Sequence, residues 1–231
     1  MNAQRFAVSA CVTGLGTGAV LGRSKLLRWG ATADEVREAL PGDNLVRDPH
    51  LTATRAITIH RTAAEVWPWI AQLGQGRGGF YSYDRLENLI GCDIHSADRV
   101  VAAWQEVRVG HEVRLSPEVA LAVALADAPL ALVLRGGVPM GVHPPPYDFS
   151  WAFVLHEDPP GVTRLVVRER YRYLRAWARL IVEPVAVVSF VMTQRMLLGI
   201  RDRVEATEAT AAPYFSHAHP SQSRPVHAAR R

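Results

Sequence analysis

The chain of 231 residues is long enough for one sizeable hydrophobic core and rather short for two. Its formal net charge of +4 does not indicate a nucleic-acid partner, because residues 1–30 and 209–231 contain bases and no acid, leaving 19 basic against 22 acidic side chains between them. The two cysteines, Cys11 and Cys92, form neither a CxxC motif nor a disulfide framework, so a reduced cytoplasm is the expected compartment.

Residues 6–22 are apolar and rich in small side chains, with Arg5 before them and Arg23, Lys25 and Arg28 after them. The segment is a little short of the roughly 20 residues that span a bilayer, and it lacks a small-x-small cleavage site. A weak membrane anchor, a signal-like segment and a docked helix therefore all remain open. If the segment inserts, the positive charge after it predicts that the following domain is tethered on the cytoplasmic side.

Neither glycine-rich stretch predicts a nucleotide site. Gly14-x-Gly16-x-x-Ala19 matches a dinucleotide fingerprint in form, but no apolar second strand follows it before Asp34. The glycines of residues 74–79 come after a predicted helix, whereas a phosphate loop places them before one, and no Gly-Lys-Ser/Thr completes the pattern. No cofactor is expected.

The first half of the predicted domain alternates turns with short regular elements. Residues 31–51 indicate a short helix and a turn-rich lead-in, and residues 52–60 form a β-branched strand. Thr62-x-x-Glu65 is a capping box, which opens an apolar helix kinked at Pro68 and ended by Gly74. Ser82 is the predicted cap of a second helix that stops at Gly91.

The second half reads as antiparallel strands and a closing helix. The predicted strands are Val113–Leu115, Glu118–Ala126, Leu130–Arg135, Phe149–Glu157 and Thr163–Tyr173, the last two joined by the turn "DPPG". The closing helix carries an apolar stripe with steps of three and four residues, made of Ile181, Val185, Val188, Met192, Met196 and Ile200. Pro184 either starts its main segment or bends it.

This order fits an α+β fold in which a curved antiparallel sheet wraps around a long C-terminal helix, and the residues add a resemblance. "ATRAITIHRTAAEVWPWIAQLGQGRGGFYSYDRLENLIGCDIHSADRV", "LVLRGGVPMG", "YDFSWAFVL" and "LVVRERYRY" resemble the SRPBCC superfamily, the START-like, Bet v 1-like group with polyketide cyclases and lipid-transfer proteins. The resemblance covers residues 45–205, and the GGFYSYDRLEN block is similar to one bacterial branch. It implies a helix-grip fold with an internal apolar cavity over residues 52–208. Residues 209–231 are expected to be a disordered basic tail.

The resemblance carries over no catalytic residue, so the cavity wall is predicted from residue types. Phenols can line an apolar pocket and still donate a hydrogen bond, and methionines give an adaptable wall. The residues expected to contact a ligand are Trp69, Tyr81, Tyr83, His95, Trp151, Glu169, Tyr171, Met192 and Met196.

Glu169 is unusual because strand alternation places it on the apolar face of residues 163–173, opposite four arginines. In this fold the first and last strands are neighbours, and Arg55 lies on the apolar face of the first. A buried Arg55–Glu169 ion pair is therefore expected. The open alternative is a polar anchor for a ligand oxygen, or an acid/base for a cyclase.

The cluster Cys92-Asp93-x-His95 with Asp98 does not predict a metal site, since no second Cys/His pair follows at zinc-site spacing. Its polar side chains are expected to satisfy loop backbone groups instead. The residues favour a protein that binds or carries a hydrophobic small molecule such as a lipid, isoprenoid or polyketide, with membrane contact through residues 6–22 as a further hypothesis. A cyclase or hydratase acting on such a ligand is the alternative, and whether the chain is an enzyme stays open.

Overall fold

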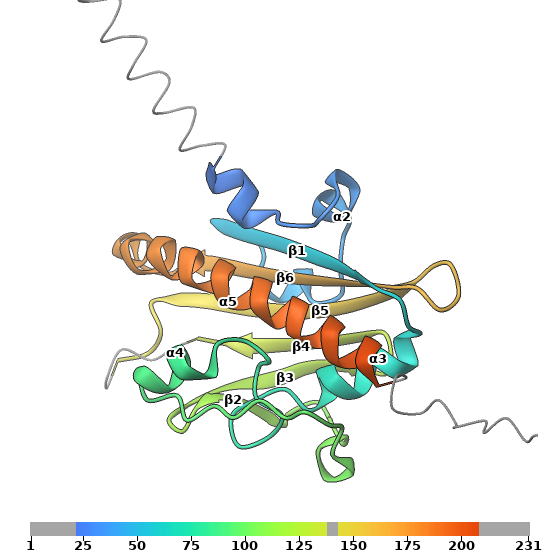
Figure 1. The fold of residues 1–231 in the computed structure, drawn as a ribbon. Coiled ribbons are helices and arrows are strands. Elements are labelled where there is room, and N and C mark those ends of the chain that lie inside the picture. The colour runs from blue at the N-terminus through green and yellow to red at the C-terminus, as the bar shows by residue number, and fades with distance from the viewer. Residues whose placement is uncertain (1–21, 138–142, 208–231) are drawn as a thin grey trace, which may run out of the picture.

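The strands of the chain form one antiparallel sheet in the order β1-β6-β5-β4-β3-β2 (Figure 1). The computed structural model describes residues 22–137 and 143–207, so the apolar segment ahead of residue 22 and the C-terminal tail lie outside the described residues. The strands are β1 Leu51–Ile59, β2 Glu112–Ser116, β3 Val119–Asp127, β4 Ala131–Gly136, β5 Tyr147–Glu157 and β6 Thr163–Tyr173. Their bounds differ from the predicted ones by at most two residues, and the predicted neighbourhood of the first and last strands is confirmed.

Helices cover both faces of this sheet. The long helix α5 (Arg179–Ala206) crosses one face, with α3 (Ala63–Ala71) beside its C-terminal end and α4 (Asp84–Leu89) across the same face (Figure 1). Residues 22–27 are also helical, and there are three 3-10 turns: η1 Asp43–Leu45, η2 Ala102–Trp104 and η3 Ala176–Ala178. The sheet that grips its C-terminal helix is the predicted α+β helix-grip arrangement.

The lead-in covers the opposite face of the sheet. A second apolar cluster forms there, made of Leu40, Ala56, Val133, Ala152, Val154 and Val166. Helix α2 (Ala33–Arg37) and η1 bring acids onto the arginines of β6: Arg164 pairs with Glu35 at 2.6 Å, and Arg168 pairs with Asp43 at 2.6 Å. These arginines hold the lead-in to the sheet, so this basic strand face is not a free surface for phosphates.

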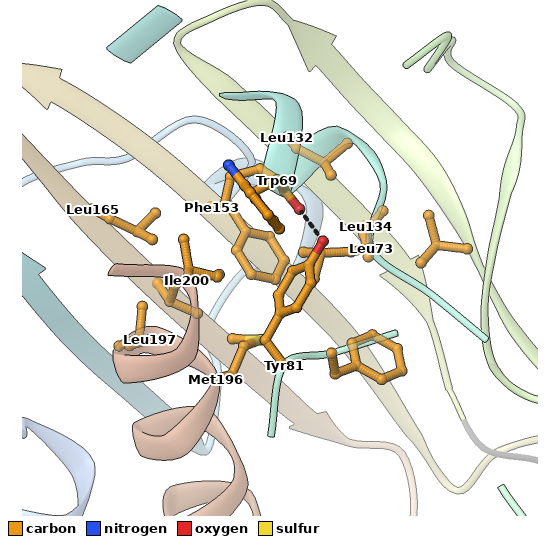
Figure 2. Packing of buried hydrophobic residues seen from close by; sticks show 14 of the residues in the cluster. Trp69, Leu73, Tyr81, Leu132, Leu134, Phe153, Leu165, Met196, Leu197 and Ile200 are labelled. Carbon is orange, nitrogen blue, oxygen red and sulfur yellow. Dashed lines mark hydrogen bonds between the residues drawn. The ribbon is translucent and has the colours of Figure 1, made fainter. Parts of the chain in front are cut away.

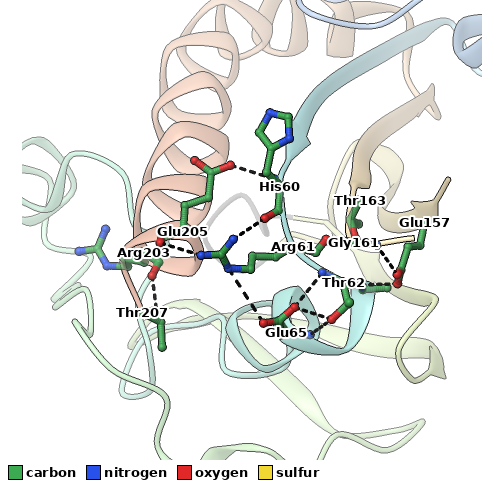
Figure 3. Close-up of polar contacts among 11 residues, drawn as sticks. His60, Arg61, Thr62, Glu65, Glu157, Gly161, Thr163, Arg203, Glu205 and Thr207 are labelled. Atoms are coloured by element: carbon green, nitrogen blue, oxygen red, sulfur yellow. Dashed lines mark hydrogen bonds and ion pairs between the residues drawn. The ribbon is translucent and has the colours of Figure 1, made fainter. Parts of the chain in front are cut away.

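The junction between β1 and α3 is fixed by side chains that accept backbone hydrogen bonds (Figure 3). Thr62 and Glu65 form the predicted capping box, in which each side chain bonds the other residue's backbone N–H. The backbone N–H of Ala63 donates to the Glu157 carboxylate of β5 at 2.7 Å, and the backbone N–H of His60 donates to the Glu205 carboxylate of α5 at 2.9 Å. The start of α3 is thereby tied to the sheet and to the end of α5.

The main core lies between the sheet, α3 and the second half of α5 (Figure 2). Tyr81 packs edge-on against Trp69 at 5.7 Å between ring centroids, and its hydroxyl donates to the Trp69 carbonyl at 3.2 Å. Gly199 of α5 permits this approach, because a Cβ there would lie 2.2 Å from the Tyr81 carbonyl oxygen. Met196, Leu197 and Ile200 of α5 are buried in the same cluster.

Two local predictions are wrong. Ser82 does not cap α4, since the helix follows Tyr83 without a side-chain cap and the Ser82 hydroxyl donates to Glu87 at 2.8 Å. The predicted stripe of α5 is buried only in its second half, and Val188 is 61% exposed. The reason is that the first half of α5 packs on the core through Val182 and Ala186, each one position after a residue of the predicted stripe.

Candidate ligand-binding site

A mostly apolar cavity of about 240 Å³ lies between the sheet, α4 and the middle of α5. Its walls come from elements far apart in the sequence. The lining residues are Phe80, Ser82, Glu87, Leu115, Leu121, Gly137, Tyr147, Phe149, Trp151, Glu169, Tyr171, Val185, Ser189, Met192, Thr193 and Met196.

The sheet contributes an aromatic wall. Tyr147, Phe149 and Trp151 are alternate residues of β5, so their side chains share one face. The Phe149 ring lies 4.6 Å from that of Tyr171 on the neighbouring strand, and the Trp151 ring lies 5.9 Å from that of Phe80. Rings tilted against one another in this way offer apolar surface to a ligand.

Glu169 forms the centre of a polar network on the same wall. Its Oε1 accepts from Arg55 Nη1 at 2.9 Å, from Ser189 at 2.6 Å and from Thr193 at 3.1 Å. Its Oε2 lies 2.7 Å from the Ser189 hydroxyl and accepts from the Tyr171 hydroxyl at 3.2 Å. The Arg55 and Glu169 side chains are buried, so the ion pair that strand alternation predicts is present. Both carboxylate oxygens are engaged by protein donors.

Tyr171 takes part in this network as a neutral phenol. Burial, followed by the negative charge of Glu169, raises the pKa of Tyr171 well above its usual range. The phenol therefore keeps its proton and donates it to the carboxylate, rather than to a ligand.

Glu87 lies on the α4 wall in a different setting. The Ser82 hydroxyl donates to its Oε1 at 2.8 Å, but its Oε2 is buried and has no partner among the described residues. Burial raises the pKa of Glu87, the nearby charge of Asp84 raises it further, and the Ser82 hydrogen bond only partly opposes them. Trp151 also has a buried Nε1–H without a partner in the described part of the chain.

The short helix α4 owes its position to two polar side chains. Asp84 accepts from the Ser96 backbone N–H at 2.7 Å and from the Ser96 hydroxyl at 2.6 Å. Asn88 bonds both backbone groups of Ile94, a fully buried residue of the following loop. These contacts hold the helix across the cavity although no residue within it is buried.

The structure places five of the nine predicted contact residues on the cavity wall: Trp151, Glu169, Tyr171, Met192 and Met196. Strand alternation places Trp151, Glu169 and Tyr171 on the apolar faces of their strands, and helix spacing places Met192 and Met196 on one stripe. Among the residues that the sequence reasoning missed, Phe149 alternates with Trp151, and Ser189 and Thr193 are spaced by four on the apolar helix. Both patterns are visible in the sequence.

The other four predicted residues lie outside this cavity. Trp69 and Tyr81 belong to the core, where burial raises the pKa of Tyr81 to about 12 and Gln72 donates to its hydroxyl at 2.9 Å. Tyr83 is 41% exposed at the start of α4. His95 is exposed, and its Nε2 lies 3.2 Å from Asp93 Oδ1. Tyr81, Tyr83 and His95 belong to a loop-rich segment, where no periodicity reveals which way a side chain points. Trp69 belongs to the apolar face of α3, which packs into the core.

The loop after α4 shows no metal arrangement. Within residues 22–137 and 143–207, no group of three or more His, Cys, Asp and Glu side chains is placed to hold an ion. Cys92 is a free, half-buried thiol, and burial raises its pKa.

Comparison with known proteins finds similarity in structure only, since no family model and no curated protein matches the chain. A protein from Mesorhizobium loti matches at 16% identity over 68% of this chain and 98% of that one, with a TM-score of 0.41. A polyketide_cyc-like protein from Corynebacterium glutamicum matches at 14% over 73% and 96%, with a TM-score of 0.38. Norcoclaurine synthase from Thalictrum flavum matches at 11% over 68% and 96%, with a TM-score of 0.40. The solved structures that match thus include proteins of the polyketide cyclase-like group that the sequence resembles, and scores at this level say nothing of a ligand or a reaction.

One described segment, Ala176–Ala206, is long and apolar enough to cross a bilayer by length and composition. It comprises η3 and α5, and its second half packs into the core as the helix that the sheet grips.

Proposed function

We propose that the protein binds a hydrophobic small molecule in the cavity between β5, α4 and α5. The observation that supports this most is a largely apolar space of about 240 Å³ walled by Phe149, Trp151 and Met196. Because an apolar cavity of about 150 Å³ is able to bind benzene, a space of about 240 Å³ suits a bicyclic aromatic body. Burial of such a body contributes about 25 cal/mol for each Å² removed from water.

A neutral fluorescent probe tests the proposal. N-phenyl-1-naphthylamine brightens in apolar surroundings and should bind the full chain at one site. Met192→Trp places a large ring in the cavity and should weaken binding at least about tenfold, because the added ring occupies the ligand's volume. Leu130→Trp changes an exposed leucine outside the cavity and is the matched control. Equal binding by wild type and Met192→Trp would overturn the proposal.

Binding rather than turnover is the function that the polar network favours. The predicted acid/base, Glu169, has both oxygens engaged by Arg55, Ser189, Thr193 and Tyr171, so neither is left for a proton of the ligand. A general acid or base needs direct or water-mediated reach to the reacting proton. Steady turnover of a bound ligand that Glu169→Gln abolishes while binding is kept would instead assign a cyclase-type reaction.

We propose in addition that the start of α5 contacts a membrane with anionic lipids. Leu180, Val187, Val188 and Val191 are exposed on one side of the helix, and Trp177 of η3 is exposed just before them. Arg175 and Arg179 lie beside this apolar stripe in the sequence. Exposed aliphatic and Trp side chains next to arginines suit the interface between headgroups and acyl chains.

Arg23 lies near the same part of α5. It forms an ion pair with Glu183 of α5 at 2.9 Å. Val185 is both exposed and part of the cavity wall, which connects the stripe with the ligand site. A ligand could then pass between bilayer and cavity while the domain stays on the cytoplasmic side.

Vesicle co-sedimentation tests this contact. The full chain should sediment with vesicles of equal phosphatidylglycerol and phosphatidylcholine, and less with phosphatidylcholine alone, because the arginines add electrostatic attraction. The double variant Leu180→Glu, Val188→Glu should lose most of this binding, while Leu130→Glu should keep it. Unchanged sedimentation of the double variant would exclude α5 as the contact.

A further inference from the structure

A second, polar groove lies at the start of α5, and it shares no lining residue with the ligand cavity. Segments far apart in the sequence meet there: the helical residues 22–27, the residue before β1, the end of β6, η3 and the first turns of α5. Its polar lining residues, which we call the basic groove, are Arg23, His50, Tyr173, Arg175, Arg179 and Glu183. Three arginines and one acid give this groove a net charge of +2 when His50 is neutral.

The charges of the basic groove are only partly offset within the protein. Glu183 accepts from Arg23 Nε at 3.2 Å and from Arg23 Nη2 at 2.9 Å, so these two charges offset one another. Arg175 and Arg179 are exposed, and neither forms an ion pair among the described residues. The four arginines of β6 differ, since each of them pairs with an acid of the protein. The basic groove therefore keeps two positive charges that no described acid meets.

These charges gather around the stacked rings of His50 and Tyr173. The ring centroids lie 4.7 Å apart with an angle of 11° between the planes. His50 Nδ1 accepts from the Tyr173 backbone N–H at 3.1 Å, so a neutral His50 ring has its proton on Nε2. Burial raises the pKa of Tyr173 and the Glu183 charge adds to this, whereas the charges of Arg23 and Arg179 oppose it. One phenol is thus close enough to feel all three charges.

The chemistry of the two unpaired arginines indicates a phosphate monoester. A guanidinium group donates two parallel hydrogen bonds to a phosphate or carboxylate. A phosphate monoester carries a charge of about −1.5 to −2 near pH 7, which complements the net charge of the groove. A carboxylate or a phosphodiester carries a single negative charge, which would leave one arginine without an anion.

Apolar side chains beside the groove indicate that this phosphate belongs to a lipid. Leu174, Trp177 and Leu180 are 48%, 49% and 69% exposed, and they alternate with Arg175 and Arg179 along the chain. A free phosphate would gain nothing from these side chains. The acyl chains of a lipid would lie against them while its headgroup meets the arginines.

We propose that the basic groove binds the phosphate monoester headgroup of a membrane lipid, held by Arg175 and Arg179 beside the ring of His50. This inference rests on the proposed contact of α5 with a membrane, and it gives that contact a specific class of lipid. The pair of Arg23 and Glu183 forms one side of the groove rather than holding the phosphate.

Two vesicle compositions of nearly equal surface charge test the choice of headgroup. One contains phosphatidic acid, a phosphate monoester, in phosphatidylcholine. The other contains phosphatidylglycerol, a phosphodiester, at twice that mole fraction, because a monoester carries about twice the charge. In co-sedimentation titrations the full chain should bind the phosphatidic acid vesicles about tenfold more tightly, since the second arginine gains charge-assisted hydrogen bonds.

Calorimetric titration separates a lipid from free phosphate as the source of the group. Dihexanoyl phosphatidic acid, used below the concentration at which it forms micelles, and inorganic phosphate present similar oxygens, and only the first has acyl chains. The lipid should bind at least about tenfold more tightly, because its chains cover exposed apolar surface. Equal affinities would overturn the assignment of the groove to a lipid.

Variants at exposed arginines locate the site and should fold as wild type. Arg175→Gln and Arg179→Gln should each lower the preference for phosphatidic acid by about threefold to tenfold. The double change Arg175→Lys, Arg179→Lys keeps the charge and removes the planar fork, so it should keep phosphatidylglycerol binding and still lower the preference. Arg85→Gln removes the same charge from an exposed position of α4 outside the groove, and as the matched control it should keep the preference.

The outcomes separate this inference from the membrane contact on which it rests. If the wild-type chain sediments with neither kind of vesicle, the proposed contact fails and the inference fails with it. If it binds both kinds equally, the contact stands and the phosphate monoester site is overturned. A preference for phosphatidic acid that persists in the Arg175→Gln, Arg179→Gln double variant would overturn the basic groove as its site.

Discussion

Glu169 and Glu87 are carboxyl groups on two walls of the same cavity, and their surroundings differ. Glu169 lies in the middle of β6, and its donors come from β1, β6 and α5, elements separated by up to 138 positions between Arg55 and Thr193. Glu87 lies on the six-residue α4, with one donor from Ser82 and one unmet oxygen. The Glu169 carboxylate is held by long-range contacts that form with the core, whereas Glu87 keeps one buried oxygen that has no partner among the described residues.

The largest expected effect is on the Glu169 wall. Glu169→Gln should lower the free energy of unfolding by about 3–5 kcal/mol, because Arg55 loses its charge partner in a buried site. The double change Arg55→Met, Glu169→Leu should recover much of this loss, since it removes both buried charges. Urea denaturation of the three proteins measures both values. An unchanged midpoint for Glu169→Gln would show that this network does not stabilise the fold.

A smaller effect is expected from a single donor. Ser189→Ala should cost about 1.5–3 kcal/mol in the free energy of unfolding, the range for a hydrogen bond to a charged group. Thr193→Val removes a longer contact of 3.1 Å with little change of shape, so its cost should be lower. Denaturation curves with equal slopes would show which of the two variants is less stable. A larger loss of stability in Thr193→Val would contradict the assignment of Ser189 as the main donor.

The smallest effect is expected on the α4 wall, where it depends on pH. The folded pKa of Glu87 is raised above 4.5, so the stability linked to its protonation is present below that pH and is lost as the pH rises through the folded pKa. Glu87→Leu removes both the hydrogen bond from Ser82 and the stability that wild type loses when Glu87 deprotonates. The free energy of unfolding of the variant should therefore differ from that of wild type by less than about 1 kcal/mol. The variant should become more stable relative to wild type as the pH rises. Thermal unfolding of wild type and variant across this pH range gives the difference. A variant that becomes relatively less stable as the pH rises would show that the Glu87 pKa is not raised.

Local rules were sufficient for much of the fold. The capping box of Thr62 and Glu65 and the alternation of residues 163–173 each depend on contacts within a few residues, and both are present in the structure. Alternation also placed Glu169 and Arg55 on the same face, because a strand has a period of two and the first and last strands of this fold pair. This made a buried ion pair predictable from two residues 114 positions apart.

Local rules were insufficient for residues 74–100, where turns replace periodic elements. Tyr81, Tyr83 and His95 have the composition of a binding wall, yet Tyr81 points into the core and the other two are exposed. Their direction follows from how Ser96, Asp84 and Ile94 hold the loop, and those contacts do not show in the sequence as a repeat.

The sequence by itself determined the elements, their order and the side of each strand that faces the core, because hydrophobic periodicity and capping act over short distances. Tertiary structure decided the rest. In the first half of α5, Val182 and Ala186 face the core, each one position after a residue of the predicted stripe, and Val188 is therefore outside. Glu87 became a wall residue because the loop brings α4 to the cavity. Burial thus depends on which segments meet rather than on the residue's neighbours in the chain.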